Sequence, residues 1–311
     1  MSEPLHIAVL MGGWSAEREV SLKSGEGVAA ALEGLGHEVT RIDMDRNIAL
    51  VLDGVRPDLV FNALHGTPGE DGSVQGLLDL MGLAYTHSGL EASVVAIDKE
   101  LTKAVLVPRG IRMPEGRIVA SESLFERDPL PRPYVVKPVN EGSSVGVAIV
   151  AADSNCGDPI ARDSEGPWRH FERLLAEPFI AGRELTVALL GDRALGVTEL
   201  RPKAGFYDYD AKYTEGLTTH VCPADIPGEV REAAMETALK AHRLIGCRGT
   251  SRADFRWDEA RGVDGLHLLE INTQPGMTEL SLVPEQAALH GLDYAGLVQA
   301  IVDEALKGEA R

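Results

Sequence analysis

The fold of this chain is decided by the stretch His267-Leu-Leu-Glu270-Ile-Asn272-Thr-Gln-Pro-Gly276-Met-Thr, with Ser251-Arg252-Ala-Asp254 upstream. Leu266–Asn272 and Thr250–Trp257 are rich in apolar and β-favouring residues, so both are predicted to be strands. Residues two apart in a strand point to the same face of the sheet. The polar run Asp258–Gly265 between the two strands predicts a hairpin loop.

A hairpin centred near Arg261–Gly262 would place Asp254 opposite Glu270 and Arg252 opposite Asn272. Two carboxylates and an amide would then share one face beside an arginine. Mg²⁺ prefers oxygen ligands and is usually held by one or two carboxylates together with substrate phosphates. The hairpin therefore predicts a metal site, and the alternative is a cross-strand salt bridge beside an exposed asparagine.

The composition is that of an acidic globular protein. Its 311 residues suit two or three domains, and its 44% hydrophobic and 25% charged residues are ordinary proportions. Acidic residues outnumber basic ones by 48 to 30, which gives a net charge of −18. A surface of this sign argues against nucleic acid and membranes as partners. The net charge does not exclude phosphate ligands, because their binding depends on the local charge of a site.

The cysteines and the N-terminus predict a soluble protein of the cytoplasm. Cys156, Cys222 and Cys247 are scattered and form no C-x-x-C pair, which fits a reducing compartment and argues against a zinc site. The N-terminus lacks the pattern of a signal peptide. No apolar run approaches the roughly 20 residues that a membrane span needs.

The first part of the chain alternates strands and helices, which predicts a parallel sheet covered by helices on both faces. Ligands of such sheets gather where the strands end, and the predicted strands end at Gly12-Gly13 and His65-Gly66. Neither end matches a dinucleotide-binding or P-loop motif. The predicted strands are His6–Met11, Glu38–Asp43 and Leu59–Ala63, with a helix ending at Leu35.

The rest of the chain predicts mixed α and β structure, with an antiparallel meander after Glu177. The polar segment Asn155–Gly166 is interpreted as a surface loop, and the unpatterned segment Phe206–Thr219 as a functional loop. The predicted helices are Asp98–Val107, Trp168–Leu175, Glu229–Leu244, Pro284–Leu289 and Tyr294–Leu306. The predicted strands are Tyr134–Pro138, Val145–Val150, Pro178–Ile180, Glu184–Leu190 and Ala194–Arg201.

Several polar groups have both a functional and a structural interpretation. The loop Glu141–Gly146, with hydroxyls at Ser143 and Ser144, could hold phosphate beside Lys137, or be an ordinary glycine-rich hairpin. Lys99 could be a second phosphate cation or a surface lysine. Glu17 could bind an ammonium group or interact with a helix dipole. His65 could be a general base or a structural histidine. Lys212 and Tyr213 could have a functional role in their loop or only hold that loop in place.

Taken together and in order, these motifs resemble those of the D-alanine–D-alanine ligases, and the resemblance runs from about Ile7 to the C-terminal helix. The motifs are Gly12-Gly13-x-Ser15-x-Glu17-Arg18-Glu19-Val20-Ser21, Leu64-His65-Gly66, Gly69-Glu70-Asp71-Gly72, Asp98-Lys99, Val136-Lys137-Pro138, Glu141-Gly142-Ser143-Ser144-Val145-Gly146, Phe206-Tyr207-Asp208-Tyr209-x-x-Lys212-Tyr213, Arg252-x-Asp254, and Leu269-Glu270-Ile271-Asn272-Thr273-x-Pro275-Gly276-Met277-Thr278.

The resemblance implies an α/β fold of the three-domain ATP-grasp type. An N-terminal parallel α/β domain (1–97) would be followed by a central ATP-grasp domain (98–181) and a C-terminal catalytic one (182–311), the two clamping ATP. The family uses ATP and Mg²⁺ to join two D-alanines through a D-alanyl phosphate, for peptidoglycan. Two Mg²⁺ ions are implied, with Mn²⁺ as an alternative metal. Relatives are often homodimers.

The resemblance also implies roles for individual residues. For the nucleotide and metal these are Asp254, Glu270 and Asn272 as metal ligands, Lys99 and Lys137 on the phosphates, Ser143 in the loop that closes over ATP, Glu184 on the ribose, and Glu177, Phe179 and Ile180 along the adenine. For the amino acids they are Glu17 on the first ammonium, His65 near the first carboxyl end, Arg252 and the Gly276 amide as oxyanion site, Ser281 and Leu282 on the second carboxylate, and Lys212 and Tyr213 in the lid.

The chain departs from relatives at a few positions. Pro178 stands where many have lysine, and Gln274 replaces a small hydroxyl residue of the metal-strand motif. Two alternatives to a D-alanine ligase remain: a ligase of the same fold that accepts D-lactate or D-serine second, and a nucleotide-binding regulator without catalysis. Tyrosine at position 213 is the residue that accompanies dipeptide formation in related ligases, whereas phenylalanine accompanies D-lactate.

Overall fold

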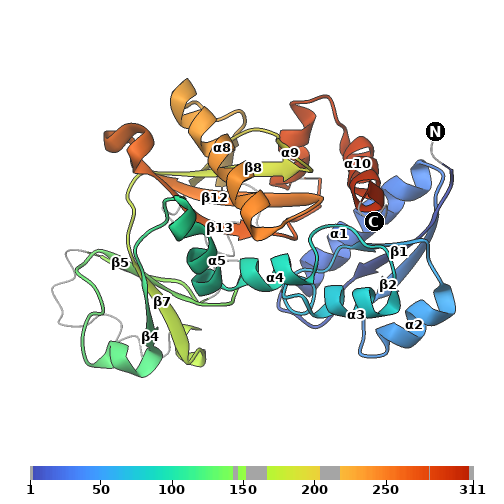
Figure 1. Cartoon of the computed structure of the whole chain (residues 1–311), viewed down its shortest axis with the longest axis horizontal. Coiled ribbons are helices and arrows are strands. Elements are labelled where there is room, and N and C mark those ends of the chain that lie inside the picture. Colours follow the sequence, from blue (N-terminus) through green and yellow to red (C-terminus); the bar gives the residue numbers. More distant parts are fainter. Residues whose placement is uncertain (1–2, 143–145, 152–166, 204–217, 280, 308–311) are drawn as a thin grey trace.

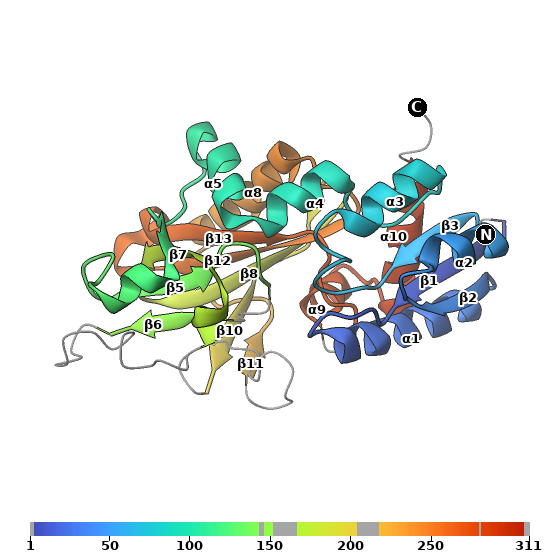
Figure 2. The ribbon, with the colours of Figure 1, turned by 90° about the horizontal axis from the view of Figure 1, so that it is seen from below.

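The computed structural model describes residues 3–142, 146–151, 167–203, 218–279 and 281–307. Three sheets follow one another along the chain; α-helices pack against the first and the last, and short 3₁₀ segments pack against the middle one (Figures 1 and 2). The chain is therefore of mixed α/β class, as predicted. Within the described ranges, no helix combines the length and apolar character that crossing a membrane would require.

The N-terminal sheet is parallel, as predicted, with strand order β2-β1-β3. Alternate side chains of the central strand enter two different cores: Val9 packs towards α1 and α10, and Leu10 packs towards α2 and α3. Helices therefore cover both faces of this sheet (Figure 1). The elements are β1 (His6–Met11), α1 (Arg18–Gly34), β2 (Glu38–Asp43), α2 (Ile48–Val55), β3 (Leu59–Asn62), α3 (Ser73–Met81) and, from the other end of the chain, α10 (Tyr294–Lys307).

The C-terminal sheet is antiparallel, with strand order β11-β10-β8-β12-β13 and β9 beside β8. One face of β8, β12 and β13 packs against α4, α5 and α8 in the largest core. The opposite face carries polar side chains such as those of Thr186 and Asp254, except where Ala188 of β8 packs into the core that includes α10. The elements are α4 (Leu90–Ile97), α5 (Lys99–Leu106), β8 (Arg183–Leu190), β9 (Arg193–Ala194), β10 (Thr198–Pro202), β11 (Thr218–Val221), α8 (Gly228–Ile245), β12 (Thr250–Trp257), β13 (Leu266–Asn272) and α9 (Leu282–Ala288).

The central sheet has strand order β4-β7-β5-β6 and its own small core. The predicted helix Trp168–Leu175 is wrong: a short 3₁₀ turn, Pro167–His170, leads into a strand. The apolar run at 174–176 is too short to separate helix from strand, and its place between two other strands decides the outcome. The strands are β4 (Arg117–Ala120), β5 (Tyr134–Pro138), β6 (Ala148–Val150) and β7 (Arg173–Pro178).

Other predicted boundaries also moved. The strand predicted at Pro178–Ile180 is wrong, because β7 ends at Pro178, and the strand predicted at Ala194–Arg201 is divided between β9 and β10. The loop Asn155–Gly166 lies outside the described residues. The domain boundaries at residues 97 and 181 remain predictions; α9 and α10 share a core with the N-terminal sheet.

Candidate active site

The predicted pairing of the two site strands is confirmed. On β12 and β13, Arg252 lies opposite Asn272 and Asp254 lies opposite Glu270. The intervening residue Ala253 is fully buried in the large core, so the polar residues on either side of it point to the opposite face. Arg252, Asp254, Glu270 and Asn272 are called the metal face below.

A β-bulge makes this face possible, and the sequence pattern alone missed it. Phe255 pairs with Leu268 whereas Asp254 pairs with Glu270, so one extra residue, Leu269, stands on β13. Leu268 and Ile271 consequently both enter the large core although they are three positions apart. Bulges re-aim side chains in this way, often beside active sites. Without the bulge, Glu270 would share a face with Leu268.

The carboxylates of the metal face have different surroundings. Asp254 accepts two hydrogen bonds from Arg252, at 2.8 and 2.7 Å, and one from the Thr186 hydroxyl of β8, at 2.7 Å. This salt bridge between Arg252 and Asp254 runs along one strand. Glu270 is 27% exposed, and its Oε2 lies 3.8 Å from Lys99 Nζ.

The donor set of the metal face fits a hard cation that also binds substrate phosphates. In the described part of the chain, no three His, Cys, Asp or Glu side chains form a metal cage. The face instead offers two carboxylates and the amide of Asn272, which is the small, oxygen-only set typical of Mg²⁺. A Ca²⁺ site would need more protein oxygens.

Two predicted phosphate cations are buried, and one of them, Lys99, lies beside this face. Lys99, in the first turn of α5, donates to the Glu141 carbonyl at 2.6 Å. Lys137 of β5 lies 2.7 Å from Glu177, whose other oxygen lies 2.5 Å from Lys103. The interpretation of Lys99 and Lys137 as surface lysines is therefore wrong. Lys103 was not singled out from the sequence, although it follows Lys99 by one helical turn.

Glu177 is the acidic centre of this lysine pair. Burial acts to raise the pKa of its carboxyl, but the charges of Lys137 and Lys103 outweigh burial and hold the pKa below its ordinary value. Burial lowers the pKa of Lys103. The three side chains connect α5 to the central sheet, and we call them the lysine clamp.

The segment after β7, predicted to lie along adenine, is ordered by Arg256 of β12. Arg256 Nε donates to the Ile180 carbonyl at 3.1 Å, and its guanidinium lies 5.5 Å from the centre of the Phe179 ring. The same guanidinium lies 3.5 Å from Glu184 of β8. Arg256 was missed in the sequence, yet its spacing of two from Asp254 would have placed it on the same face.

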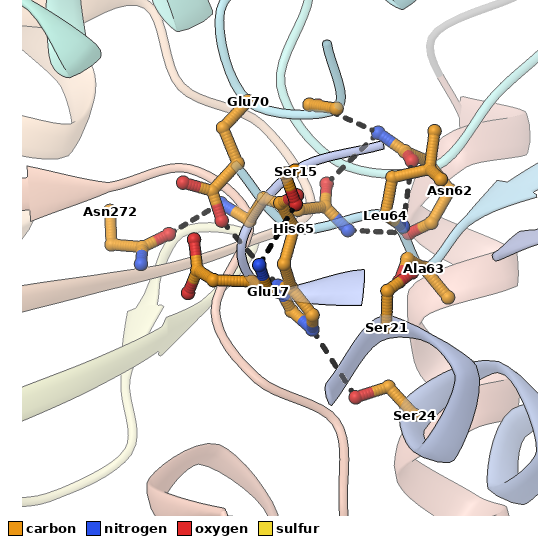
Figure 3. Close-up of polar contacts among 12 residues, drawn as sticks. Ser15, Glu17, Ser21, Ser24, Asn62, Ala63, Leu64, His65, Glu70 and Asn272 are labelled. Carbon is orange, nitrogen blue, oxygen red and sulfur yellow. Dashed lines mark hydrogen bonds and ion pairs between the residues drawn. The ribbon is translucent and has the colours of Figure 1, made fainter. Parts of the chain in front are cut away.

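A second polar site, the N-terminal polar cluster, consists of Ser15, Glu17, His65 and Glu70 in the loops after the parallel strands, together with Ser24 of α1 (Figure 3). The Ser15 hydroxyl donates to the His65 carbonyl at 2.6 Å and accepts from the Glu17 N–H at 3.1 Å. His65 Nε2 lies 3.2 Å from the Ser24 hydroxyl, and Nδ1 lies 3.4 Å from Glu70.

The two carboxylates of this cluster lie close to the glycine loop of the central sheet. A β-carbon at Gly142 would lie 3.8 Å from Glu70 Oε2 and 4.0 Å from Glu17 Oε2. Burial raises the pKa of Glu70, and the nearby charge of Glu17 raises it further, against the effect of His65. An ammonium group would offset the buried negative charge. Glu70 belongs to a motif of the resemblance but was assigned no role from the sequence.

The segment after β13 carries the predicted oxyanion and second-substrate groups. The Ser281 hydroxyl lies 2.8 Å from the Thr278 hydroxyl and accepts from the Thr278 N–H at 3.0 Å. A β-carbon at Gly276 would lie 3.0 Å from the Ser281 hydroxyl, so glycine permits this close approach. Leu282 is buried and begins α9. Ser143, Lys212 and Tyr213 lie outside the described residues.

Solved structures with the same fold are ligases. The chain superposes on a D-alanine–D-alanine ligase from Bacillus anthracis complexed with ATP with a TM-score of 0.81, at 30% identity, covering 99% of this chain and 98% of that one. A D-alanine–D-alanine ligase from Coxiella burnetii gives 0.79 at 27% identity, covering 99% and 95%. The fold is that of the ATP-grasp ligases.

Sequence comparisons narrow this class to one family. Residues 120–303 match the model of the D-ala D-ala ligase C-terminus, and residues 52–88 match that of the N-terminus. A D-alanine–D-alanine ligase from Rhizorhabdus wittichii is 74% identical over 310 residues, covering 100% of this chain and 99% of that protein. One from Zymomonas mobilis is 65% identical over 306 residues, covering 98% and 95%. The chain belongs to the D-alanine–D-alanine ligase family.

Proposed function

We propose that this protein joins two D-alanine molecules into D-alanyl-D-alanine, with cleavage of ATP to ADP and phosphate, to supply peptidoglycan synthesis in the cytoplasm. Membership of the family and the 74% identical ligase from Rhizorhabdus wittichii support this reaction. The observation that carries the proposal is the metal face, where Asp254 and Glu270 face each other across two strands beside Lys99.

The first step is transfer of the γ-phosphoryl group of ATP to the carboxylate of the first D-alanine. Phosphoryl transfer depends on positioning and on cations that neutralise the spreading negative charge. Lys99 and Lys137 supply two such cations on the phosphates. Glu17 holds the ammonium of the first D-alanine, and His65 lies near its carboxyl end. These placements agree with the buried charges of the N-terminal polar cluster and the lysine clamp.

Asp254, Glu270 and Asn272 would hold Mg²⁺, with Mn²⁺ as an alternative metal. Such ions, two in this proposal, neutralise phosphate charge and align the transferred group when bound. Arg252 orients Asp254 through its paired hydrogen bonds. This pairing leaves the more exposed Glu270 as the carboxylate that is most readily accessible to a cation.

The second step is attack of the second D-alanine's amine on the acyl phosphate, which expels phosphate from a tetrahedral intermediate. Arg252 and the Gly276 N–H stabilise the oxyanion of that intermediate. Ser281 and the backbone at Leu282 bind the second carboxylate, which requires the Ser281 hydroxyl to exchange its present contacts with Thr278. By the resemblance, Lys212 and Tyr213 would belong to the lid over the site, and Ser143 to the loop that closes over the nucleotide.

The nucleotide lies between the central and C-terminal sheets in this proposal. Phe179 and Ile180 flank the adenine, and Glu184 contacts the ribose. Glu177 acts through the lysine clamp, because both of its oxygens face lysines.

One assay tests the proposal and its substrate. Purified protein is given ATP, Mg²⁺ and equal concentrations of D-alanine and D-lactate, ADP release is followed, and products are separated by mass. We expect D-alanyl-D-alanine as the main product. Tyr213→Phe should gain depsipeptide activity near neutral pH, because the variant would lose the proposed hydrogen bond from the tyrosine hydroxyl to Glu17. The loss of one hydrogen bond to a charged group changes a substrate preference by about ten-fold or more. Depsipeptide as the main product of the natural chain would refute the substrate. Absence of ADP release would refute the ligase.

A further inference from the structure

A buried pair of amides joins the metal-face strand to the N-terminal sheet. Gln274 lies two residues beyond β13 and is 1% exposed, and Asn62 ends β3 and is fully buried. Gln274 Nε2 donates to the backbone carbonyl of Asn62 at 2.5 Å, and Gln274 Oε1 accepts from Asn62 Nδ2 at 3.3 Å. These residues are 212 positions apart and adjoin different sheets, so no strand ladder sets their relative position.

Each residue of the pair is also bonded to a segment of the candidate site. The backbone N–H of Gln274 donates to Asn272 Oδ1, at 2.7 Å, and so orients an amide of the metal face. Asn62 Oδ1 accepts from the Leu64 N–H at 3.1 Å, and Asn62 Nδ2 donates to the Gly69 carbonyl, also at 3.1 Å. Leu64 and Gly69 bracket His65, so Asn62 holds the loop of the N-terminal polar cluster (Figure 3).

We propose that Gln274 is a positioning residue, which with Asn62 forms an amide clamp that sets the metal face in register with the first-substrate loop; this inference rests on the proposed function. Transfer of a phosphoryl group between the two sites requires that they be aligned, and a displacement of about 1 Å can cost about 100-fold in rate. Hydrogen bonds between buried amides are directional, and leaving one unmade is costly, so they hold a position better than apolar contacts do.

The clamp depends on the length of the Gln274 side chain, whose amide reaches both the carbonyl and the side chain of Asn62. The oxygen of a serine or threonine at position 274 would stand two bonds nearer the backbone than the amide of glutamine. Such a side chain would not carry its polar atom to the Asn62 carbonyl from the same backbone position.

A matched control comes from another glutamine that crosses between the same parts of the molecule. Gln299 of α10 bonds His37 Nε2 at 2.9 Å, across 262 positions. His37 precedes β2, at the amino ends of the parallel strands, whereas the site residues follow their carboxyl ends. Gln299→Met thus removes a connection of the same kind away from the candidate site.

The experiment compares Gln274→Met, which keeps length and removes the amide, with Gln299→Met. Three quantities are measured on the whole protein: melting temperature, Mn²⁺ affinity by electron paramagnetic resonance with a non-hydrolysable ATP analogue, and kcat and KM for D-alanine. We expect Gln274→Met to weaken Mn²⁺ binding and kcat/KM by about 10- to 100-fold, because the segment that follows Asn272 loses its anchor to the N-terminal sheet, although the backbone N–H of residue 274 still donates to Asn272. Gln299→Met should lower the melting temperature but change the Mn²⁺ affinity and kcat/KM by less than about three-fold.

Equal loss of stability in the two variants, with Mn²⁺ affinity and kcat/KM kept, would overturn the proposal. If Gln274→Met does not fold, Gln274→Thr is measured in the same way, with the same two outcomes. The two proposals fail separately. A natural chain that makes no D-alanyl-D-alanine, but whose Mn²⁺–nucleotide binding needs Gln274, refutes the reaction and keeps the clamp. A natural chain that makes D-alanyl-D-alanine, but whose Mn²⁺ affinity and kcat/KM are unchanged by Gln274→Met, keeps the reaction and refutes the clamp.

Discussion

The metal face and the N-terminal polar cluster both carry paired carboxylates, but they are built differently. Asp254 and Glu270 stand on two neighbouring strands, and the backbone ladder between those strands sets their separation. Glu17 and Glu70 come from loops after parallel strands, and hydroxyl groups such as that of Ser15 hold those loops. The first pair keeps some exposure, and the second is buried.

The difference suggests different ligands for the two regions. A pair of carboxylates at a partly exposed strand pair can receive a metal together with phosphate. Buried carboxylates surrounded by loop amides, with the pKa of Glu70 raised by burial, suit a substrate ammonium that enters without its water. Substitutions in the two regions should therefore impair different properties of the enzyme: turnover with Mg²⁺ and phosphate at the metal face, and use of the first D-alanine at the N-terminal polar cluster.

The largest expected effect is at the metal face. Glu270→Gln keeps size but removes a charged ligand, and turnover should fall by about 100-fold or more because charge on the transferred phosphate is no longer neutralised. ADP release is measured across a range of Mg²⁺ concentrations. Glu259→Gln, at the exposed turn of the same hairpin, is the control. Near-normal ADP release by Glu270→Gln at limiting Mg²⁺ would show that Glu270 has a structural role and is not a metal ligand.

A smaller effect is expected for Lys137→Met in the lysine clamp. The KM for ATP should rise by about ten-fold, and the free energy of unfolding should fall by about 1–3 kcal/mol because buried Glu177 loses one of its two cations. Lys307→Met, at an exposed pair, should change stability by less than about 0.5 kcal/mol.

The pH dependence of this variant checks the cause. In the natural chain the lowered pKa of Glu177 contributes stability above its unfolded pKa, near 4.5, which is lost as the pH falls through the folded pKa. The deficit of Lys137→Met should therefore be full at pH 7 and shrink below about pH 4.5. Urea unfolding at several pH values measures it. A deficit that is independent of pH would separate Lys137 from Glu177.

Ser15→Ala tests the loop-built region with a still smaller effect. It removes a bond to the His65 carbonyl and one from the Glu17 N–H, which together contribute about 1 kcal/mol, so kcat/KM for the first D-alanine should fall about five-fold. The KM for ATP should stay within about two-fold. Ser123→Ala, whose hydroxyl donates to Ala120 in the central part of the chain, is the control. A parallel rise in both KM values would contradict a local role.

The smallest effect on activity at neutral pH is expected for His87, which is fully buried against Phe61. Burial, with the nearby charge of His65, lowers its pKa to about 3. The unfolded chain takes up a proton near pH 6.5, so stability falls with pH below that point by about 1.4 kcal/mol per unit. His87→Asn should flatten this fall in urea unfolding between pH 6.5 and 5, and asparagine tolerates the left-handed backbone at this position. An unchanged slope, with exposed His170→Asn as control, would contradict the assignment.

Local pattern was sufficient for elements whose period is unambiguous. The parallel N-terminal strands, α8 and α10 were predicted correctly, and so was the pairing of Asp254 with Glu270. The strand at Arg173–Pro178 was mistaken for a helix, because a short apolar run fits either period until its neighbours are known. The bulge at Leu269 was missed for a similar reason: an extra residue is visible only against a partner strand.

The sequence by itself determined the class of fold, the family and the residues of the metal face, because strand periodicity and ordered motifs are local properties of the chain. Only the tertiary structure decided that Lys137 is buried against Glu177, that Arg256 orders the segment after β7, and that Gln274 reaches Asn62 across 212 positions. Contacts of this kind join segments from different sheets. Their geometry depends on how the sheets pack, and no periodicity in the chain records that packing.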